Sequence, residues 1–327
     1  MTQPHETYSA LSLEAAYQLL YGQPATSEVL ATLREVVGKD SIDTLYELRS
    51  ILMRLDRQSH PSSVTIRFGL NDLRRVQMHG FHLLVDALDL SVSGPIIAAG
   101  TWEPHLTGVF QRYIKPGWRV ADVGANVGYF TMLAASIVGS EGEVLAFEPN
   151  SENARLLLLN AAENAFSMVK LYPLALSDRP GHAYFSSFVG SNGGFLTGSN
   201  AELADGRGLV VPTATLDDLI KAPLHFMKLD VEGAEYRVLQ GALALLASAH
   251  PIVTIEFSCE MVRRVSGIEP RSLLALFLHY GYSIHLIDRT SNTLQSIDDI
   301  DAFLTAWGRM DRIEDLLMLP AGSAVLP

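Results

Sequence analysis

The strongest chemical signal in the sequence is an acidic, glycine-containing turn between an expected strand and an expected helix. The turn reads Asp122-Val-Gly124-Ala-Asn126-Val-Gly128. Gly124 and Gly128 permit a tight turn and a close backbone approach by a ligand, and the amides at a helix start can receive a carboxylate. The pattern therefore predicts a loop that binds a small molecule.

An acidic residue ends the next expected strand. Glu148 follows Phe147 and precedes Pro149. In doubly wound sheets a carboxylate at this point is placed to accept the two hydroxyls of a ribose. The two features together predict a nucleoside pocket.

The residues of this loop indicate which nucleoside-containing cofactor it binds. A dinucleotide fingerprint would need glycine at positions 126 and 129, where this chain has Asn126 and Tyr129. Asp122 places a negative charge near the loop, which repels phosphate but can hold the ammonium of an amino acid. Both facts favour S-adenosylmethionine over NAD. The sequence contains neither a P-loop nor a G-x-S-x-G nucleophile elbow.

A second group of charged residues follows a later strand. Lys228 and Asp230 are two residues apart and therefore share one face of that strand, with Asp230 at its carboxyl end. Glu232 and Glu235 open the next helix, where the helix dipole stabilises carboxylates, so Glu235 is interpreted as a structural acid.

If the cofactor is S-adenosylmethionine and the group that takes its methyl is a hydroxyl, that hydroxyl must lose its proton, and a base is then expected. Asp230 and Glu232 are the leading candidates, with Lys228 beside them and with Glu256 and His225 behind them. Alternatively, Asp230 and Glu256 hold Mg²⁺ or another hard cation that lowers the pKa of the hydroxyl. A metal site of this kind usually includes a further Asp-Asp or Asp-Asn pair. We favour catalysis without a metal, because Phe257 and Ser258 follow Glu256 instead. The other histidines show no metal-ligand spacing.

Alternating elements position these residues. Elements of these lengths imply βαβ units, a mostly parallel sheet and helices on both faces, with the ligand at the carboxyl ends of the strands. The expected fold class is therefore α/β, with a Rossmann-like, doubly wound sheet. Strands are predicted over 118–123, 143–147, 169–174, 224–229, 252–257, 282–287 and 316–319, and helices over 129–138, 151–164, 236–247 and 271–280.

Three regions are expected along the chain. Apolar residues at helical spacing over 8–58, with Ser41 as a candidate N-cap, predict an N-terminal helical region over 1–60 that forms an oligomer contact or a lid over the acceptor. A small β or linker region follows over 61–109, with strands over 64–68 and 81–85, and the catalytic domain spans 110–327. Segment 186–208, dense in Gly, Ser and Asn, is either a functional loop or disordered.

The composition narrows the class of partner. The 327 residues include 24 Lys and Arg against 36 Asp and Glu, a net charge of −12 that argues against nucleic acid and anionic membrane. The single cysteine, Cys259, excludes a disulfide framework and fits a reducing, cytoplasmic location. No secretory signal or transmembrane segment is expected, since the N-terminus lacks a basic start and no apolar run approaches membrane-spanning length.

The sequence resembles the FkbM family of S-adenosylmethionine-dependent methyltransferases. The matching stretches occur in the family's order between about 90 and 320. They are Thr101-Trp-Glu-Pro104, Asp122-Val-Gly-Ala-Asn-Val-Gly-Tyr-Phe-Thr131, Phe147-Glu-Pro149, Ala175-Leu-Ser-Asp178, Lys228-Leu-Asp-Val-Glu-Gly-Ala-Glu235 and Thr254-Ile-Glu-Phe257.

The resemblance implies a class I methyltransferase fold and O-methylation of a sugar, a glycan or a natural-product hydroxyl. It implies that Ser177 and Asp178 contact adenine, although a simple turn is an alternative. Glu103 either caps a helix or reaches the methionine end of the cofactor. The expected cofactor-binding residues are Glu103, Asp122, Gly124, Asn126, Gly128, Tyr129, Glu148, Pro149, Ser177 and Asp178.

The resulting hypothesis is a cytoplasmic O-methyltransferase with a saccharide or glycosylated acceptor. O-methylation of a polyketide or other non-sugar metabolite is one alternative. A noncatalytic S-adenosylmethionine-binding scaffold and an NAD-dependent oxidoreductase are the alternatives from other classes, and the missing glycines at 126 and 129 oppose the latter.

Overall fold

The computed structural model describes residues 11–12, 41–42, 73–86, 89, 92–187, 194–197, 208–307 and 312–326. The chain divides into two compact units. One comprises Met1–Arg75 and Val85–Ala99, and the other comprises Val76–Leu84 and Gly100–Pro327.

Short elements make up the described part of the first unit. Strand β1 (Leu11–Ser12) pairs antiparallel with β2 (Ser41–Ile42), and helix α4 spans Ser93–Ala99. The helical prediction is therefore wrong at these four strand residues, because pairing between distant segments overrides local apolar spacing. The remainder of the region 1–60 and the strand predicted over 64–68 lie outside the described residues.

A hairpin crosses from the first unit to the second. Strands β3 (Leu73–Gln77) and β4 (His82–Asp86) form a two-stranded sheet. Strand β4 matches the strand predicted over 81–85.

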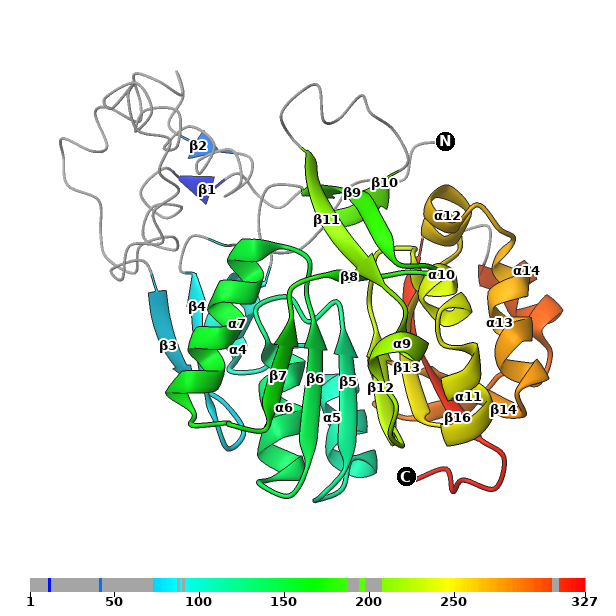
Figure 1. Ribbon diagram of the computed structural model, residues 1–327, viewed down its shortest axis with the longest axis horizontal. Helices are drawn as coiled ribbons and strands as arrows, with labels where there is room; N and C mark the ends of the chain where they lie inside the picture. Colours follow the sequence, from blue (N-terminus) through cyan, green and yellow to red (C-terminus); the bar gives the residue numbers. More distant parts are fainter. Residues whose placement is uncertain are drawn as a thin grey trace. The chain divides into compact units, whose positions relative to one another are not determined.

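An eight-stranded sheet forms the centre of the second unit (Figure 1). Its order is β15-β14-β16-β13-β12-β5-β6-β7, with β7, β6, β5, β12 and β13 parallel and β16 antiparallel between β13 and β14. This is the class I methyltransferase fold. The strands are β5 (Arg119–Val123), β6 (Glu143–Phe147), β7 (Val169–Tyr172), β12 (Phe226–Leu229), β13 (Ile252–Ser258), β14 (Tyr282–Ile287), β15 (Leu294–Ser296) and β16 (Ile313–Pro320).

Helices cover both faces of this sheet, so its central strands are apolar on both sides. Met227 and Leu229 of β12 pack with residues of α9, α10, α11 and α13, whereas Phe226 faces Phe110 of α5. The helices are α5 (Pro104–Tyr113), α6 (Tyr129–Val138), α7 (Ser151–Glu163), α9 (Leu216–Leu219), α10 (Glu235–Gln240), α11 (Leu243–Ala249), α12 (Cys259–Met261), the π-helix η1 (Val262–Ser266), α13 (Pro270–His279) and α14 (Ile300–Trp307).

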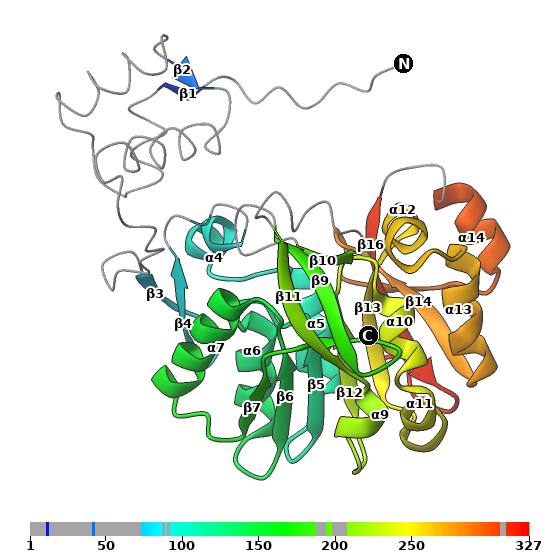
Figure 2. The ribbon, with the colours of Figure 1, turned by 45° about the horizontal axis from the view of Figure 1, so that its top comes forward.

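A second, four-stranded sheet lies at the carboxyl end of the central strands (Figures 1 and 2). It consists of β8 (Ala175–Leu176), β9 (Gly181–Ser187), β10 (Gly194–Thr197) and β11 (Gly208–Ala214), in the order β10-β9-β11-β8. The segment 186–208 therefore begins and ends in strands, and its residues 188–193 and 198–207 lie outside the described part of the chain. The sequence patterns did not reveal this sheet.

A glycine divides the helix predicted over 236–247. Helix α10 ends at Gln240 and α11 begins at Leu243, with Gly241 between them. A Cβ on Gly241 would lie 2.1 Å from the carbonyl oxygen of Ser177. The chain therefore comes too close to Ser177 at this point for any side chain.

We predict that Gly241→Ala destabilises the protein by about 1–3 kcal/mol, since the added methyl group must displace the backbone near Ser177. Thermal unfolding measures the effect. Gly108→Ala is the matched control, because its Cβ would meet only Arg112 Nη2 at 3.9 Å within helix α5, where alanine is favoured. Equal unfolding midpoints for the two variants would contradict the steric account.

Candidate functional site

The glycine-containing loop lies between β5 and α6, as expected. Gly124 has φ 79°, and a Cβ there would lie 1.7 Å from the carbonyl oxygen of Asp230. Asn126 has φ 51° and Gly128 has φ 95°, so three residues of this short loop adopt left-handed backbone. The loop is thus packed against the residue that ends β12.

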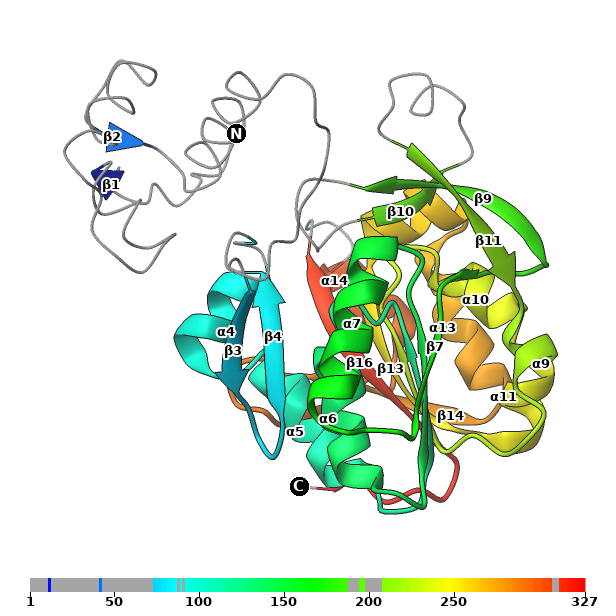
Figure 3. The ribbon, with the colours of Figure 1, turned by 60° about the vertical axis from the view of Figure 1, so that its left-hand side comes forward.

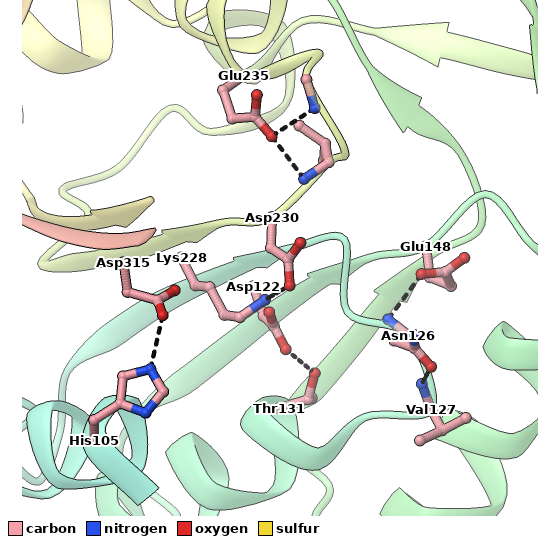
Figure 4. Close-up of polar contacts among 12 residues, drawn as sticks. His105, Asp122, Asn126, Val127, Thr131, Glu148, Lys228, Asp230, Glu235 and Asp315 are labelled. Atoms are coloured by element: carbon pink, nitrogen blue, oxygen red, sulfur yellow. Dashed lines mark hydrogen bonds and ion pairs between the residues drawn. The ribbon is translucent and has the colours of Figure 1, made fainter. Parts of the chain in front are cut away.

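Glu148 holds this loop through its carboxylate. Its Oε2 accepts a hydrogen bond from Asn126 N at 2.8 Å (Figure 4). Its Oε1 accepts one from Asn150 N, also at 2.8 Å. Burial raises the pKa of Glu148 to about 7 despite these two bonds. Each oxygen keeps acceptor capacity for a further donor, such as a ribose hydroxyl.

A pocket of about 680 Å³, partly open to solvent, connects Glu148 to the second acidic group. Of the expected site residues, Gly124, Asn126, Glu148, Pro149, Asp230 and Glu232 line it. The other lining residues are Val123, Phe147, Asn150, Asn153, Leu174, Ala175, Leu176, Phe185, Val231 and Ala234. Phe185 belongs to the small sheet, whose contribution the sequence did not indicate.

Asp122 and Lys228 lie beneath the pocket on adjacent strands. Asp122 is fully buried and its Oδ2 accepts a 2.6 Å hydrogen bond from Thr131 Oγ1. Lys228 is paired with it across the β5–β12 register, lies over the ring of Phe130 and donates to Asp230 Oδ2 at 2.8 Å. Burial alone would lower the pKa of Lys228, but Asp230, Asp122 and Glu103 outweigh it and raise that pKa.

Two acids follow β12 in a turn with unusual backbone. Asp230 pairs with Lys228, while Glu232 has φ 54° and precedes Gly233, which has φ 93°. Burial, and then the charge of Asp230, raise the pKa of Glu232 to about 7. Glu235 is confirmed as a structural acid, because its Oε1 accepts from the amides of Val231 and Gly233, each at 3.1 Å.

Glu103 lies on the same side as these acids. It occupies the N-cap position of α5 with φ 41°, but its side chain forms no capping hydrogen bond. Burial, and then the nearby charges of Asp315 and Asp230, raise the pKa of Glu103 to about 8. The capping alternative is therefore wrong, and the side chain faces the charged group around Lys228.

A buried histidine was missed by the spacing argument. His105 Nε2 lies 2.7 Å from Asp315 Oδ2, which also accepts a 2.8 Å hydrogen bond from Arg289 Nη2. Positions 105 and 315 are far apart in the sequence, and no local pattern links them. This network joins α5 to β16 next to Glu103.

Three acids lie close enough to share an ion. The carboxylate oxygens of Asp230, Glu232 and Glu256 all lie within 4.8 Å of one another. Burial, and then Asp230 and Glu232, raise the pKa of Glu256 well above its usual value. Asp230 and Glu256 were the expected candidates for metal ligands, and Glu232 joins them in the structure. Protonation or a hard cation can relieve their repulsion.

Some expected residues lie away from the pocket. Ser177 Oγ donates to Asp178 Oδ1 at 3.0 Å, and neither residue lines the pocket. Tyr129 is buried, with its hydroxyl 3.0 Å from Thr107 Oγ1. His225, a secondary candidate for the base that was expected to lie too far from the carboxyl edge, accepts a hydrogen bond from Arg119 N at the amino end of the strands. The roles of these residues as ligands stay predictions.

Residues 122–308 match the Methyltransferase FkbM domain family. The chain therefore belongs to this family. In the described residues, no helix is both long and apolar enough to cross a membrane.

Individual proteins match the chain over shorter stretches or at low identity. Fibrillarin 3 of Arabidopsis thaliana is 36% identical over 78 residues, covering 21% of this chain and 26% of that protein. Protein-L-isoaspartate O-methyltransferase 1 of the same plant is 39% identical over 49 residues, covering 14% and 21%. The chain thus spans about a quarter of the length of the first relative and about a fifth of the second. The crystal structure of methyltransferase FkbM from Methylobacillus flagellatus aligns with a TM-score of 0.39 and 16% identity, covering 65% of this chain and 50% of that one.

We predict that the protein becomes more stable as the pH falls from about 8 to about 5. The folded-state pKa values of Glu103, Glu148, Glu232 and Glu235 lie at about 7 to 8, above the ordinary 4.5. Because the folded state then binds more protons than the unfolded chain, stability is greatest below pH 4.5 for these groups and is lost as the pH rises through 7 to 8.

Thermal unfolding between pH 5 and 9 measures this trend. Glu143 and Asp301, whose pKa values are lowered, affect stability only at lower pH. Glu232→Gln should flatten the slope, whereas Glu141→Gln, at an exposed position before β6, should leave it unchanged. A midpoint that rises with pH in both the wild type and Glu232→Gln would contradict the prediction.

Proposed function

We propose that the protein is an S-adenosylmethionine-dependent O-methyltransferase that acts on a hydroxyl of a sugar, a glycan or a glycosylated natural product. The observation that carries the proposal is one pocket with Glu148 at one end and Asp230 and Glu232 at the other. Membership of the methyltransferase family supports the reaction type. The choice of a saccharide acceptor rests on the family resemblance.

The donor set fits S-adenosylmethionine, which supplies a methyl group on a positively charged sulfur. Glu148 would bind the ribose hydroxyls, since its carboxylate faces the pocket and has spare acceptor capacity. Gly124 and Asn126 would line the cofactor, and the acids around Asp230 would favour its cationic end.

The acids that face the pocket would also handle the acceptor proton. Glu232 has a pKa raised to about 7, so its carboxylate is matched to take a proton near neutral pH. Asp230 is held by Lys228 and would orient the acceptor hydroxyl. If a hard cation binds at Asp230, Glu232 and Glu256, it would lower the pKa of that hydroxyl instead.

Charge argues for a neutral acceptor. The carboxylates near Lys228 would repel a phosphate backbone, which argues against nucleic acid as the substrate. A polyketide hydroxyl remains the alternative acceptor, and a noncatalytic cofactor-binding role remains the alternative class. We further propose a cytoplasmic location, supported by the single cysteine, and self-association through residues 1–60.

We predict that the protein binds S-adenosylhomocysteine and that Glu148→Gln weakens this binding by about 10–100-fold, because hydrogen bonds to a charged acceptor are lost. Titration calorimetry at pH 8, where Glu148 is ionised, measures the affinity. Glu141→Gln removes the same charge at an exposed turn and should bind as the wild type does. A folded wild type that binds no S-adenosylhomocysteine would refute the proposed function.

We predict that Glu232→Gln lowers kcat by about 10²–10⁴-fold, since a general base contributes on that order, without changing the affinity for S-adenosylhomocysteine, which lacks the positive charge on sulfur. Radiolabelled methyl transfer to a panel of neutral glycosides and polyketides identifies the acceptor and measures the rate. Glu232 suits this test better than Asp230, because Asp230→Asn would also leave buried Lys228 without its nearest partner. Unchanged kcat in Glu232→Gln would remove it from the reaction.

A further inference from the structure

Two asparagines on helix α7 bind the backbone of strand β4 as a neighbouring strand would. Asn164 Oδ1 accepts from His82 N and its Nδ2 donates to His82 O, both at 2.7 Å. One helical turn earlier, Asn160 Oδ1 accepts from Leu84 N at 2.6 Å and its Nδ2 donates to Leu84 O at 3.0 Å. Figure 3 shows β4 running beside α7. The end of the hairpin is therefore docked on α7 by side-chain amides.

Asn160 makes one contact that Asn164 does not. Its Nδ2 also donates to the carbonyl oxygen of Val127, at 2.9 Å. Val127 belongs to the loop Gly124–Gly128, which lines the pocket. Asn160 is fully buried, and the three bonds use both of its N–H groups and its oxygen. One side chain thus joins the hairpin to the loop.

Several other bonds also hold the loop: Gly124 N and Ala125 N donate to Phe147 O, and Val127 N donates to Asn126 Oδ1. Asn126 N donates to Glu148 Oε2 at 2.8 Å, and Gly128 N donates to Ala125 O at 2.9 Å. The bond from Asn160 fixes the Val127 carbonyl between these two. If that bond is lost, the peptide between Val127 and Gly128 keeps only the bond from Gly128 N to Ala125 O, which lies within the same loop, and the amide of Asn126 that Glu148 holds lies one residue away.

A ring contact supports the same connection. Phe81, at the start of β4, packs edge-on against Tyr129, the first residue of α6, with ring centroids 5.9 Å apart. The hairpin end is therefore connected to Val127 through Asn160 and touches Tyr129 directly through Phe81.

We propose that Asn160 is a positioning residue for the cofactor loop, and that it couples the shape of this loop to the docking of residues 81–84. The inference rests on the proposed function for the identity of the ligand. It requires that losing the amide of Asn160 loosens the loop, whereas losing the amide of Asn164 loosens the hairpin alone.

The matched variants Asn160→Asp and Asn164→Asp test this in the full-length protein. Each replaces an N–H donor by an oxygen, adds a negative charge at the C-terminal end of α7 and removes a hydrogen bond to β4. Asn164→Asp also removes the bond from Asn164 Nδ2 to Asn160 O. Only Asn160→Asp also removes the bond to Val127. Titration with S-adenosylhomocysteine should show about tenfold weaker binding for Asn160→Asp, and binding within about twofold of wild type for Asn164→Asp.

Hydrogen–deuterium exchange of the ligand-free proteins provides a readout that needs no cofactor. Peptides covering residues 81–86 should exchange faster in both variants, whereas peptides covering 124–131 should exchange faster only in Asn160→Asp. If Asn160→Asp does not fold, Asn160→Ser replaces it, because the shorter hydroxyl cannot reach both Leu84 and Val127.

The outcomes separate the two hypotheses. If the wild type binds no S-adenosylhomocysteine, the proposed function fails, and the exchange pattern still decides whether Asn160 orders the loop. If the wild type binds but the two variants have equal affinity and equal exchange over 124–131, Asn160 has only a structural role at the hairpin and the inference is overturned.

Discussion

The arrangement of the acids depends on the ion pairing of the buried ammonium of Lys228. It donates to Asp230 and lies opposite Asp122 in the strand register. A buried cation is costly unless it is paired, and carboxylates brought together without a cation repel one another. The buried ammonium and the carboxylates around it therefore lower each other's cost of burial. Because Lys228 and Asp230 alternate with apolar residues on β12, the same strand supplies both the charged row and the core on its opposite face.

Backbone strain is concentrated around this charge. Glu103, Asn126 and Glu232 all adopt left-handed backbone, which costs free energy for residues with a Cβ. Hydrogen bonds from backbone amides to buried carboxylates hold two of these turns. Glu148 binds the Asn126 amide, and Glu235 binds the amides on both sides of Glu232. Side chains that face the pocket are thus fixed by the backbone before any ligand binds, which reduces the cost of ordering them.

The sequence predicts those parts of the site that follow from strand periodicity. Glu148 follows β6 and Asp230 follows β12, two parallel strands on either side of β5. Their meeting at the carboxyl edge of the sheet therefore follows from topology. Contacts between distant segments are not encoded in any local pattern. His105 and Asp315 meet across the sheet, and Gly241 breaks a helix because Ser177 lies against it. The small sheet β8–β11 was missed for the same reason, since its strands pair through tertiary register, and since the Gly, Ser and Asn residues of segment 186–208 resemble a loop.

The two ends of the pocket differ in how their acids are satisfied. Two backbone amides donate hydrogen bonds to the Glu148 carboxylate. These dipoles are fixed in place, and they leave its oxygens able to accept hydrogen bonds from neutral hydroxyls. At the other end, Glu232 and Glu256 adjoin Asp230, and burial, followed by the repulsion among these carboxylates, raises the pKa values of both glutamates. Repulsion of this kind falls when a positive charge arrives or when one carboxylate takes a proton. The end of the pocket at Glu148 therefore suits the hydroxyls of a ribose. The end at Asp230 suits a cation next to a group that gives up a proton.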